Sequence, residues 1–190
     1  AYSGFRIIQK VEADHPDIVD AALPIGIVEY YAGLSNVIIQ WGASLLGLDP
    51  SRERGLTKIE RAANDGPWSW IEARGIVSFL YLWVDVDPEK ALEYSGELVE
   101  EFPGNFYFRI LYTESLIRSG KMNTALTSLN ILKKMVSNLT DIQKNWYFGY
   151  LQYELALYHL KERKTEKALV YINEADHPDI VDAALPIGIV

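Results

Sequence analysis

Turn-forming residues divide this chain into about ten helical segments, and this punctuation constrains its fold more than any other feature. Apolar residues recur at helical spacing within the segments, which are rich in Ala, Leu, Glu and Lys. Asp49 and Asp87 each precede a proline and are predicted to cap the helices that follow. Other breaks fall at residues 65–67, 103–104 and 119–120. The sequence therefore predicts an all-α fold.

The composition excludes several classes of protein. Hydrophobic residues make up 49% of the 190 residues and the formal net charge is −8, so the chain is unlike a disordered segment and unsuited to binding nucleic acid. There is no Cys, which rules out disulfides and thiol catalysis. The longest apolar stretch, 75–84, is well short of the roughly 20 residues that a membrane span needs. We expect no membrane insertion, and the pattern leaves a cytoplasmic or a periplasmic location equally open.

Small residues recur at the same place in successive helix pairs. Ala91 and Ala125 lie 34 residues apart in similar surroundings, and Ala168 follows after a further 43. Gly55 occupies the corresponding place 36 residues before Ala91. The second helix of a pair crosses the first near its start, where a bulky side chain would cost roughly 1 to 3 kcal/mol through overpacking. These four positions are therefore predicted to lie between closely packed helices.

On this 34-residue spacing, and on Pro103 twelve residues after Ala91, the chain resembles the tetratricopeptide-repeat family. The resemblance is closest over residues 68–175. The stretches 30–33 and 55–66 are also similar to bacterial tetratricopeptide proteins of the cell envelope. The family implies a right-handed superhelical solenoid of four to five antiparallel helix pairs, which we expect to form one repeat domain over residues 1–175.

In this family the first helices of the pairs line a concave groove that holds a peptide or a helix. The resemblance implies that counting back from Ala125 and Ala168 gives the groove residues. These are Tyr107, Glu114, Arg118, Tyr150, Tyr153 and Lys161. Tyr and Arg are enriched where partners bind, although packing of the tyrosines between helices is an alternative. The expected function is a non-enzymatic scaffold that binds a protein or peptide partner.

Seventeen residues occur twice without a change, at 12–28 and at 174–190. In the first copy, 17–31 is predicted to be the first helix of a pair whose second helix is 36–46. In the second copy, residues 176–190 would form a helix with no partner after it, and its apolar side chains could join molecules. The predicted assembly residues are Ile180, Val181, Leu185 and Ile187. Head-to-tail self-association through 174–190, an inert cap, and an artefact without function are the three interpretations.

Motifs that carry enzyme chemistry are absent from the sequence. It contains no Gly-rich phosphate loop, no nucleophile elbow and no HExxH. His15 and His177 belong to the two copies of one Asp-His-Pro-Asp turn, where helix-start chemistry explains them better than metal binding does. No second ligand is spaced around His159 for zinc. We therefore predict no catalytic residue, no metal and no cofactor.

Overall fold

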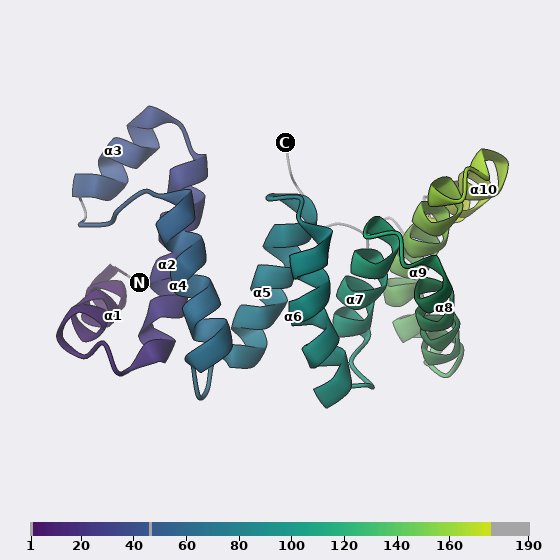
Figure 1. Ribbon diagram of the computed structural model, residues 1–190, viewed down its shortest axis with the longest axis horizontal. Coiled ribbons are helices and arrows are strands. Elements are labelled where there is room, and N and C mark those ends of the chain that lie inside the picture. The colour runs from purple at the N-terminus through teal and green to yellow at the C-terminus, as the bar shows by residue number, and fades with distance from the viewer. Residues whose placement is uncertain (1, 46, 176–190) are drawn as a thin grey trace. The chain divides into compact units, whose positions relative to one another are not determined.

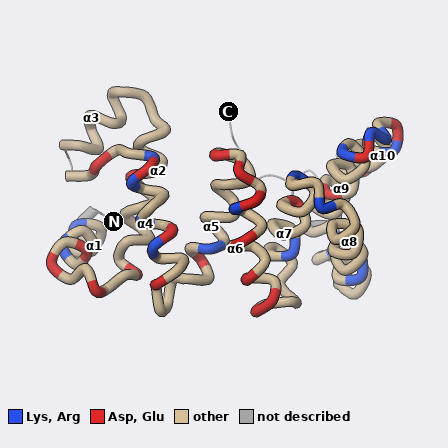
Figure 2. Tube along the Cα trace, viewed as in Figure 1, with Lys and Arg blue, Asp and Glu red and all other residues tan. Residues whose placement is uncertain are grey.

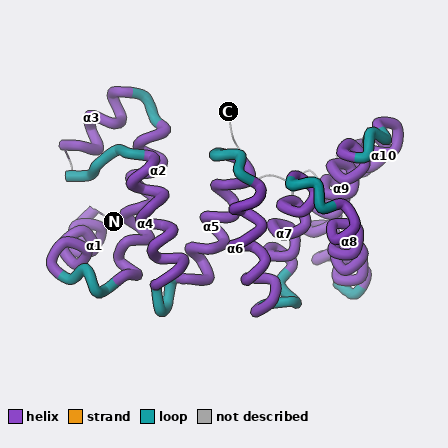
Figure 3. Tube along the Cα trace, in the orientation of Figure 1, coloured by secondary structure: helices purple, strands orange, loops and turns teal. Residues whose placement is uncertain are grey.

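The computed structural model describes residues 2–45 and 47–175, and helices are joined by short loops in these ranges (Figures 1 and 3). No strand occurs in them, which confirms the predicted all-α class. Ten α-helices and one 3-10 helix follow one another. They are α1 (Tyr2–Asp14), η1 (Val19–Ala21), α2 (Ala22–Leu34), α3 (Val37–Leu45), α4 (Arg52–Asp65), α5 (Trp70–Trp83), α6 (Pro88–Glu101), α7 (Phe106–Arg118), α8 (Met122–Ser137), α9 (Asp141–Lys161) and α10 (Thr165–Ala175).

The chain divides into two compact units, which we call the N-terminal unit (Ala1–Val77) and the C-terminal unit (Ser78–Val190). The division falls within α5, so the first turns of this helix belong to one unit and its last residues to the other. Each unit has its own buried apolar residues. The two are therefore described separately.

In the N-terminal unit, α2 packs chiefly against α4, and Figure 1 shows these two helices side by side. The contact is close because both helices present a glycine. A Cβ atom on Gly55 would lie 2.7 Å from the Gly26 carbonyl oxygen and 2.4 Å from the Tyr30 nitrogen. Around this crossing Ile25 and Ile59 are fully buried. The prediction that Gly55 lies between closely packed helices is confirmed.

The sequence-based prediction of which helix packs against α2 was wrong. A helix, α3 (Val37–Leu45), does form within the predicted range 36–46, but α3 makes only a small contact with α2, whose main partner is α4. The bounds also differ, because residues 19–21 form a 3-10 turn and α2 runs from Ala22 to Leu34 rather than from 17 to 31. The glycines at the α2–α4 crossing explain why α2 packs against α4 and not against α3, since they allow two backbones to approach more closely than side chains would permit.

Helix α3 leaves most of its apolar side chains exposed. Ile38 is 80% exposed and Trp41 is 67% exposed. No charged residue occurs between Glu29 and Asp49, so this helix carries no red or blue in Figure 2. The segment contributes an uncharged apolar surface to the N-terminal unit.

The two predicted helix caps had different outcomes. Asp87 caps α6 as expected, because its Oδ1 accepts a hydrogen bond of 3.2 Å from the Lys90 nitrogen. Asp49 does not cap α4. The cap is Ser51, whose Oγ accepts from the Arg54 nitrogen at 3.3 Å, while Asp49 forms an ion pair with the Arg54 side chain. The prediction failed because a serine two residues further on is an equally good cap and lies closer to the first helical turn.

In the C-terminal unit, each helix from α6 to α10 packs against the next, and α7 also packs against α9. Ala91, Ala125 and Ala168 are all fully buried, as their spacing predicted. A serine and a threonine join neighbouring helices in the same core, where the hydroxyls of Thr113 and Ser128 lie 2.7 Å apart. The packing of α7 on α9 is the feature that builds the candidate site.

Candidate functional site

The candidate site lies on α7 and α9 of the C-terminal unit, with one residue from the end of α5. Both main helices begin with sequence-encoded caps. Asn105 Oδ1 accepts from the Phe108 nitrogen at 3.1 Å to start α7, and Thr140 with Gln143 forms a capping box that starts α9. Leu151 and Leu155 then face the apolar core and determine which side of α9 meets its neighbours. The polar residues between them are placed by this packing.

Glu114, in the middle of α7, is the centre of the site. Its carboxylate is fully buried, and Oε1 accepts two hydrogen bonds, from Trp83 Nε1 at 2.9 Å and from Arg118 Nε at 2.6 Å. The second of these is also a salt bridge one helical turn along α7. Tyr153 of α9 lies near Arg118, because each of the two side chains shifts the pKa of the other. Two helices, α5 and α7, therefore meet at Glu114 Oε1, and α9 borders them.

Glu154 lies beside this network and is the least satisfied group of the site. It is fully buried, and neither of its side-chain oxygens has a hydrogen-bond partner. Glu114 Oε2 has no partner either. Buried polar atoms normally find a partner, so three orphan oxygens in one place call for a physical explanation. We refer to Glu114, Arg118, Tyr153 and Glu154 as the carboxylate cluster.

The pKa values of the cluster are shifted by burial and by neighbouring charges. Burial raises the pKa of Glu154 well above its ordinary value, the nearby Glu114 raises it further, and Arg118 opposes them. Burial likewise raises the pKa of Glu114, although Arg118 and the Trp83 N–H partly offset this. Burial would lower the pKa of Arg118, but the Glu114 carboxylate outweighs that effect and the net shift is upward. The cluster therefore holds two carboxyl groups and a single cation. In the folded protein it favours keeping a proton on one of the two carboxyl groups.

Solvent reaches the cluster through two of its members. The side chain of Arg118 is 29% exposed and Tyr153 is 44% exposed. Lys161 lies at the same edge, where its Nζ donates to the Arg118 carbonyl oxygen at 3.0 Å. The buried carboxyl groups are thus bordered by the partly exposed Arg118 and by the exposed Tyr153 and Lys161. Such a surface can hold a polar partner.

The structure brings together four of the six predicted groove residues: Glu114, Arg118, Tyr153 and Lys161. Tyr107 is 49% exposed and lies near the start of α7, about two helical turns before Glu114. Tyr150 is half-buried and packs against the core of the unit, which supports the packing alternative for this tyrosine. The predicted assembly residues Ile180, Val181, Leu185 and Ile187 lie outside the described residues.

Sequence reasoning missed Glu154 and the hydrogen bond from Trp83. One signal was present, because Glu154 is flanked by Leu151 and Leu155, which places a carboxylate among the apolar residues of an amphipathic helix. The hydrogen bond that Trp83 donates could not be predicted, since a tryptophan that ends a helix packs as readily as it donates.

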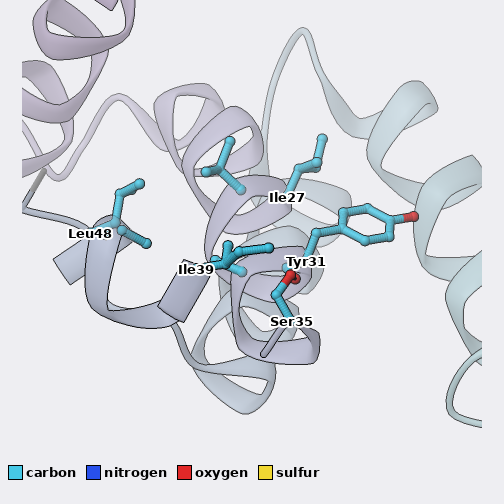
Figure 4. A pocket seen from close by; sticks show the side chains of 9 residues that line it. Ile27, Tyr31, Ser35, Ile39 and Leu48 are labelled. Carbon is cyan, nitrogen blue, oxygen red and sulfur yellow. The ribbon is translucent and has the colours of Figure 1, made fainter. Parts of the chain in front are cut away.

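A second concave surface lies in the N-terminal unit between α2 and α3 (Figure 4). It encloses about 610 Å³ and contains no charged side chain. The lining residues are Ile27, Val28, Tyr31, Ala32, Ser35, Ile39, Gly42, Ala43 and Leu48. Such a surface can hold an apolar group, but it offers no acid, base or nucleophile for catalysis.

Two other site classes were sought in the described part of the chain. Within residues 2–45 and 47–175, no group of three or more His, Asp or Glu side chains is arranged to hold a metal ion. None of the helices in these ranges is long and apolar enough to cross a membrane.

Comparison with known proteins gave no relative. The chain matches no protein-family model, no curated protein and no solved structure. The function must therefore be argued from the residues and their geometry.

Proposed function

We propose that this protein is a non-enzymatic scaffold that binds a peptide or a helix on the face formed by α7 and α9. The observation that carries the proposal is the pairing of Arg118 and Tyr153. These two partly exposed side chains come from different helices and lie near each other beside the buried Glu114 carboxylate, to which Arg118 is bonded. Tyr and Arg dominate binding energy at interfaces, because they combine a large contact area with directional hydrogen bonds.

The helix arrangement supports a solenoid of antiparallel pairs as the framework of this scaffold. In such a solenoid the first helix of one pair contacts both its own second helix and the first helix of the next pair. The contacts of α7 with α8 and with α9 follow this pattern. The buried Ala91, Ala125 and Ala168, at the spacing typical of tetratricopeptide repeats, support the same framework.

A displayed library of random dodecapeptides, selected on the full chain, tests the proposal. Peptides that bind to the α7–α9 face should lose at least tenfold in affinity, about 1.4 kcal/mol, when Tyr153 is replaced by Ala. The helical circular dichroism of this variant should be unchanged. Arg118→Ala is less suitable, because it would leave the buried Glu114 carboxylate without its counter-charge and destabilise the fold.

Tyr31→Ala is the matched control. Tyr31 is 45% exposed, nearly the same as Tyr153, but it lines the apolar groove of the N-terminal unit. Peptides that tolerate Tyr153→Ala and lose affinity with Tyr31→Ala would move the binding site to the α2–α3 groove. A selection that yields no binding peptide would remove the proposal.

A second candidate function is self-assembly through the repeated segment, supported by the place that residues 12–28 occupy in the N-terminal unit. Glu12 forms a salt bridge of 3.0 Å with Lys58 of α4, and Pro16 accepts a hydrogen bond from Arg61. Gly26 provides the close approach to Gly55. Residues 174–190 have the same sequence as residues 12–28. They could therefore take the place of residues 12–28 against α4 of another molecule, so that the two molecules exchange this segment.

Deletion of 176–190 tests this candidate. Size-exclusion chromatography with light scattering should show a mass that climbs with concentration for the full chain and stays at that of a monomer for the deletion variant. A constant mass near 21.6 kDa for the full chain would eliminate self-assembly.

A further inference from the structure

The carboxylate cluster has one positive charge for two carboxyl groups. Its described members are Glu114, Glu154 and one guanidinium, Arg118, which is bonded to Glu114. Both oxygens of Glu154 and Oε2 of Glu114 accept no hydrogen bond. When both carboxyl groups are ionised, the cluster is thus short of one cation and of up to three hydrogen-bond donors.

Leaving carboxylate oxygens buried and unpaired is costly, since each such atom loses its bonds to water and gains nothing in return. A purely structural carboxylate of this kind is usually matched by a cation on a neighbouring helix. Glu29 of the N-terminal unit is matched in this way, because Lys58 Nζ donates to its Oε1 at 3.1 Å and lies 3.0 Å from its Oε2. Within the described residues Glu154 has no equivalent partner, so its carboxyl group keeps a proton unless a cation is supplied from outside.

The carboxylate cluster can be reached from solvent beside Tyr153. Tyr153 precedes Glu154 on α9 and is 44% exposed, and the nearby Arg118 is itself partly exposed. Exposed side chains such as Tyr153 change rotamer on a timescale of nanoseconds or faster, so an entering group can displace this ring.

We propose that Glu114 and Glu154 together receive one ammonium or guanidinium group, the end of a Lys or Arg side chain of a bound peptide, which enters beside Tyr153. This inference rests on the proposed peptide-binding function and names the side chain that the surface selects. A guanidinium fits the donor requirement well, because its five N–H groups can satisfy all three orphan oxygens. Tyr153 would lie beside the aliphatic part of the entering side chain.

Other ligand classes fit less well. An anion would be repelled by the two carboxyl groups. A metal ion would find only two protein carboxylates, since no third His, Asp or Glu of the described ranges joins them. A neutral amide could donate two hydrogen bonds but would leave the charge of the cluster uncompensated.

The test uses peptides selected from the displayed dodecapeptide library on the full chain. Binders that depend on Tyr153 should share an Arg or Lys at one position. Replacement of that residue by citrulline, which keeps the size and shape of arginine and removes its charge, should weaken binding at least tenfold. This arm of the experiment requires no change in the protein.

The second arm changes the protein. Glu154→Gln should weaken the same peptides at least tenfold, because it removes a negative charge and adds donors where the ligand brings its own. The matched control is Glu101→Gln on the exposed surface of α6, which makes the same change in net charge and should alter affinity less than twofold. Equal losses for the two variants would mean that only the overall charge of the protein matters, and would overturn the inference.

The outcomes separate this inference from the function on which it rests. Peptides that need Tyr153 but bind equally well with citrulline, or equally well to Glu154→Gln, would leave the scaffold function standing and refute the cation site. A library that gives no Tyr153-dependent peptide would refute both.

Discussion

The two units of this protein bury carboxylates in opposite ways. In the N-terminal unit, Glu29 of α2 lies 3.0 Å from Lys58 of α4, which is also bonded to Glu12. In the C-terminal unit, Glu114 shares the only guanidinium of its cluster and Glu154 accepts no hydrogen bond. A paired buried charge holds two helices together, whereas an underpaired one destabilises the fold. The difference distinguishes an acid that serves structure from one that we propose serves binding.

The helix crossings differ as well. The N-terminal unit uses glycines, so that the backbones of α2 and α4 touch at Gly26 and Gly55. The C-terminal unit uses buried alanines such as Ala125, which keep a methyl group between neighbouring helices. The first arrangement tolerates no added atom, and the second has one methyl of spacing already in place. Four predictions test these contrasts.

Gly55→Ala should have the largest effect. The new Cβ would meet backbone atoms of Tyr30 and Gly26 at 2.4 to 2.7 Å, and backbone cannot rotate away as a side chain can. We expect the free energy of unfolding of the N-terminal unit to fall by about 3 kcal/mol, the upper end for overpacking. Urea unfolding, with hydrogen exchange of the α2 and α4 amides as a local readout, measures the loss. A change below 1 kcal/mol would mean that the two helices can separate at little cost.

Lys58→Met should have the next largest effect, because it leaves Glu29 buried without a counter-charge. Removing one partner of a fully buried pair costs about 3 to 5 kcal/mol, and we expect about 2 kcal/mol here because the Lys58 side chain is 27% exposed. Thermal and urea unfolding give the value. Arg54→Ala is the control, since it breaks an exposed pair with Asp49 and should cost less than about 1 kcal/mol. Equal costs for the two variants would contradict the distinction between buried and exposed pairs.

Glu154→Gln should stabilise the C-terminal unit, in contrast to Lys58→Met. Burial and Glu114 raise the pKa of Glu154, so the folded state binds the proton more tightly than the unfolded chain does. The stability that this proton contributes is present below the ordinary pKa of glutamate and is lost as the pH rises through the raised value. The substitution should therefore add about 1 to 2 kcal/mol at pH 8 and little at pH 4. Urea unfolding at both pH values measures this, with Glu101→Gln as the control; a gain of equal size at pH 4 and pH 8 would show that Glu154 does not titrate in the folded state as proposed.

Gly96→Ala should have the smallest effect, and its sign should be opposite to that of Gly55→Ala. Gly96 lies inside α6, and the nearest atom to an added Cβ is Tyr112 Cε2 at an ordinary 3.8 Å. Alanine in a helix interior is favoured over glycine by about 0.5 to 1 kcal/mol, so the melting temperature should rise slightly. A decrease on the scale of Gly55→Ala would show that α6 is as tightly packed against its neighbours as α4 is.

Much of the helical framework could be predicted from local patterns. The Asp87-Pro88 start of α6 and the burial of Ala91, Ala125 and Ala168 were read from spacing and cap chemistry. The pairing of α2 with α4 could not be predicted in this way, because it skips α3. The preference of a helix for a neighbour further along the chain leaves no local signature. Glu114, Arg118 and Tyr153 were predicted on one face, and the structure brings them together.

The sequence by itself determined that the protein is helical and where most of its helices begin and end, since side-chain periodicity and capping act over a few residues. Only the tertiary structure decided which helices touch and how well each buried charge is paired. Glu154 lies 40 residues after Glu114, and although Leu151 and Leu155 beside it hint at a buried face, nothing in the sequence pairs it with Glu114. The packing of α7 on α9 makes it a buried acid beside another one, because desolvation depends on neighbours that only the fold supplies.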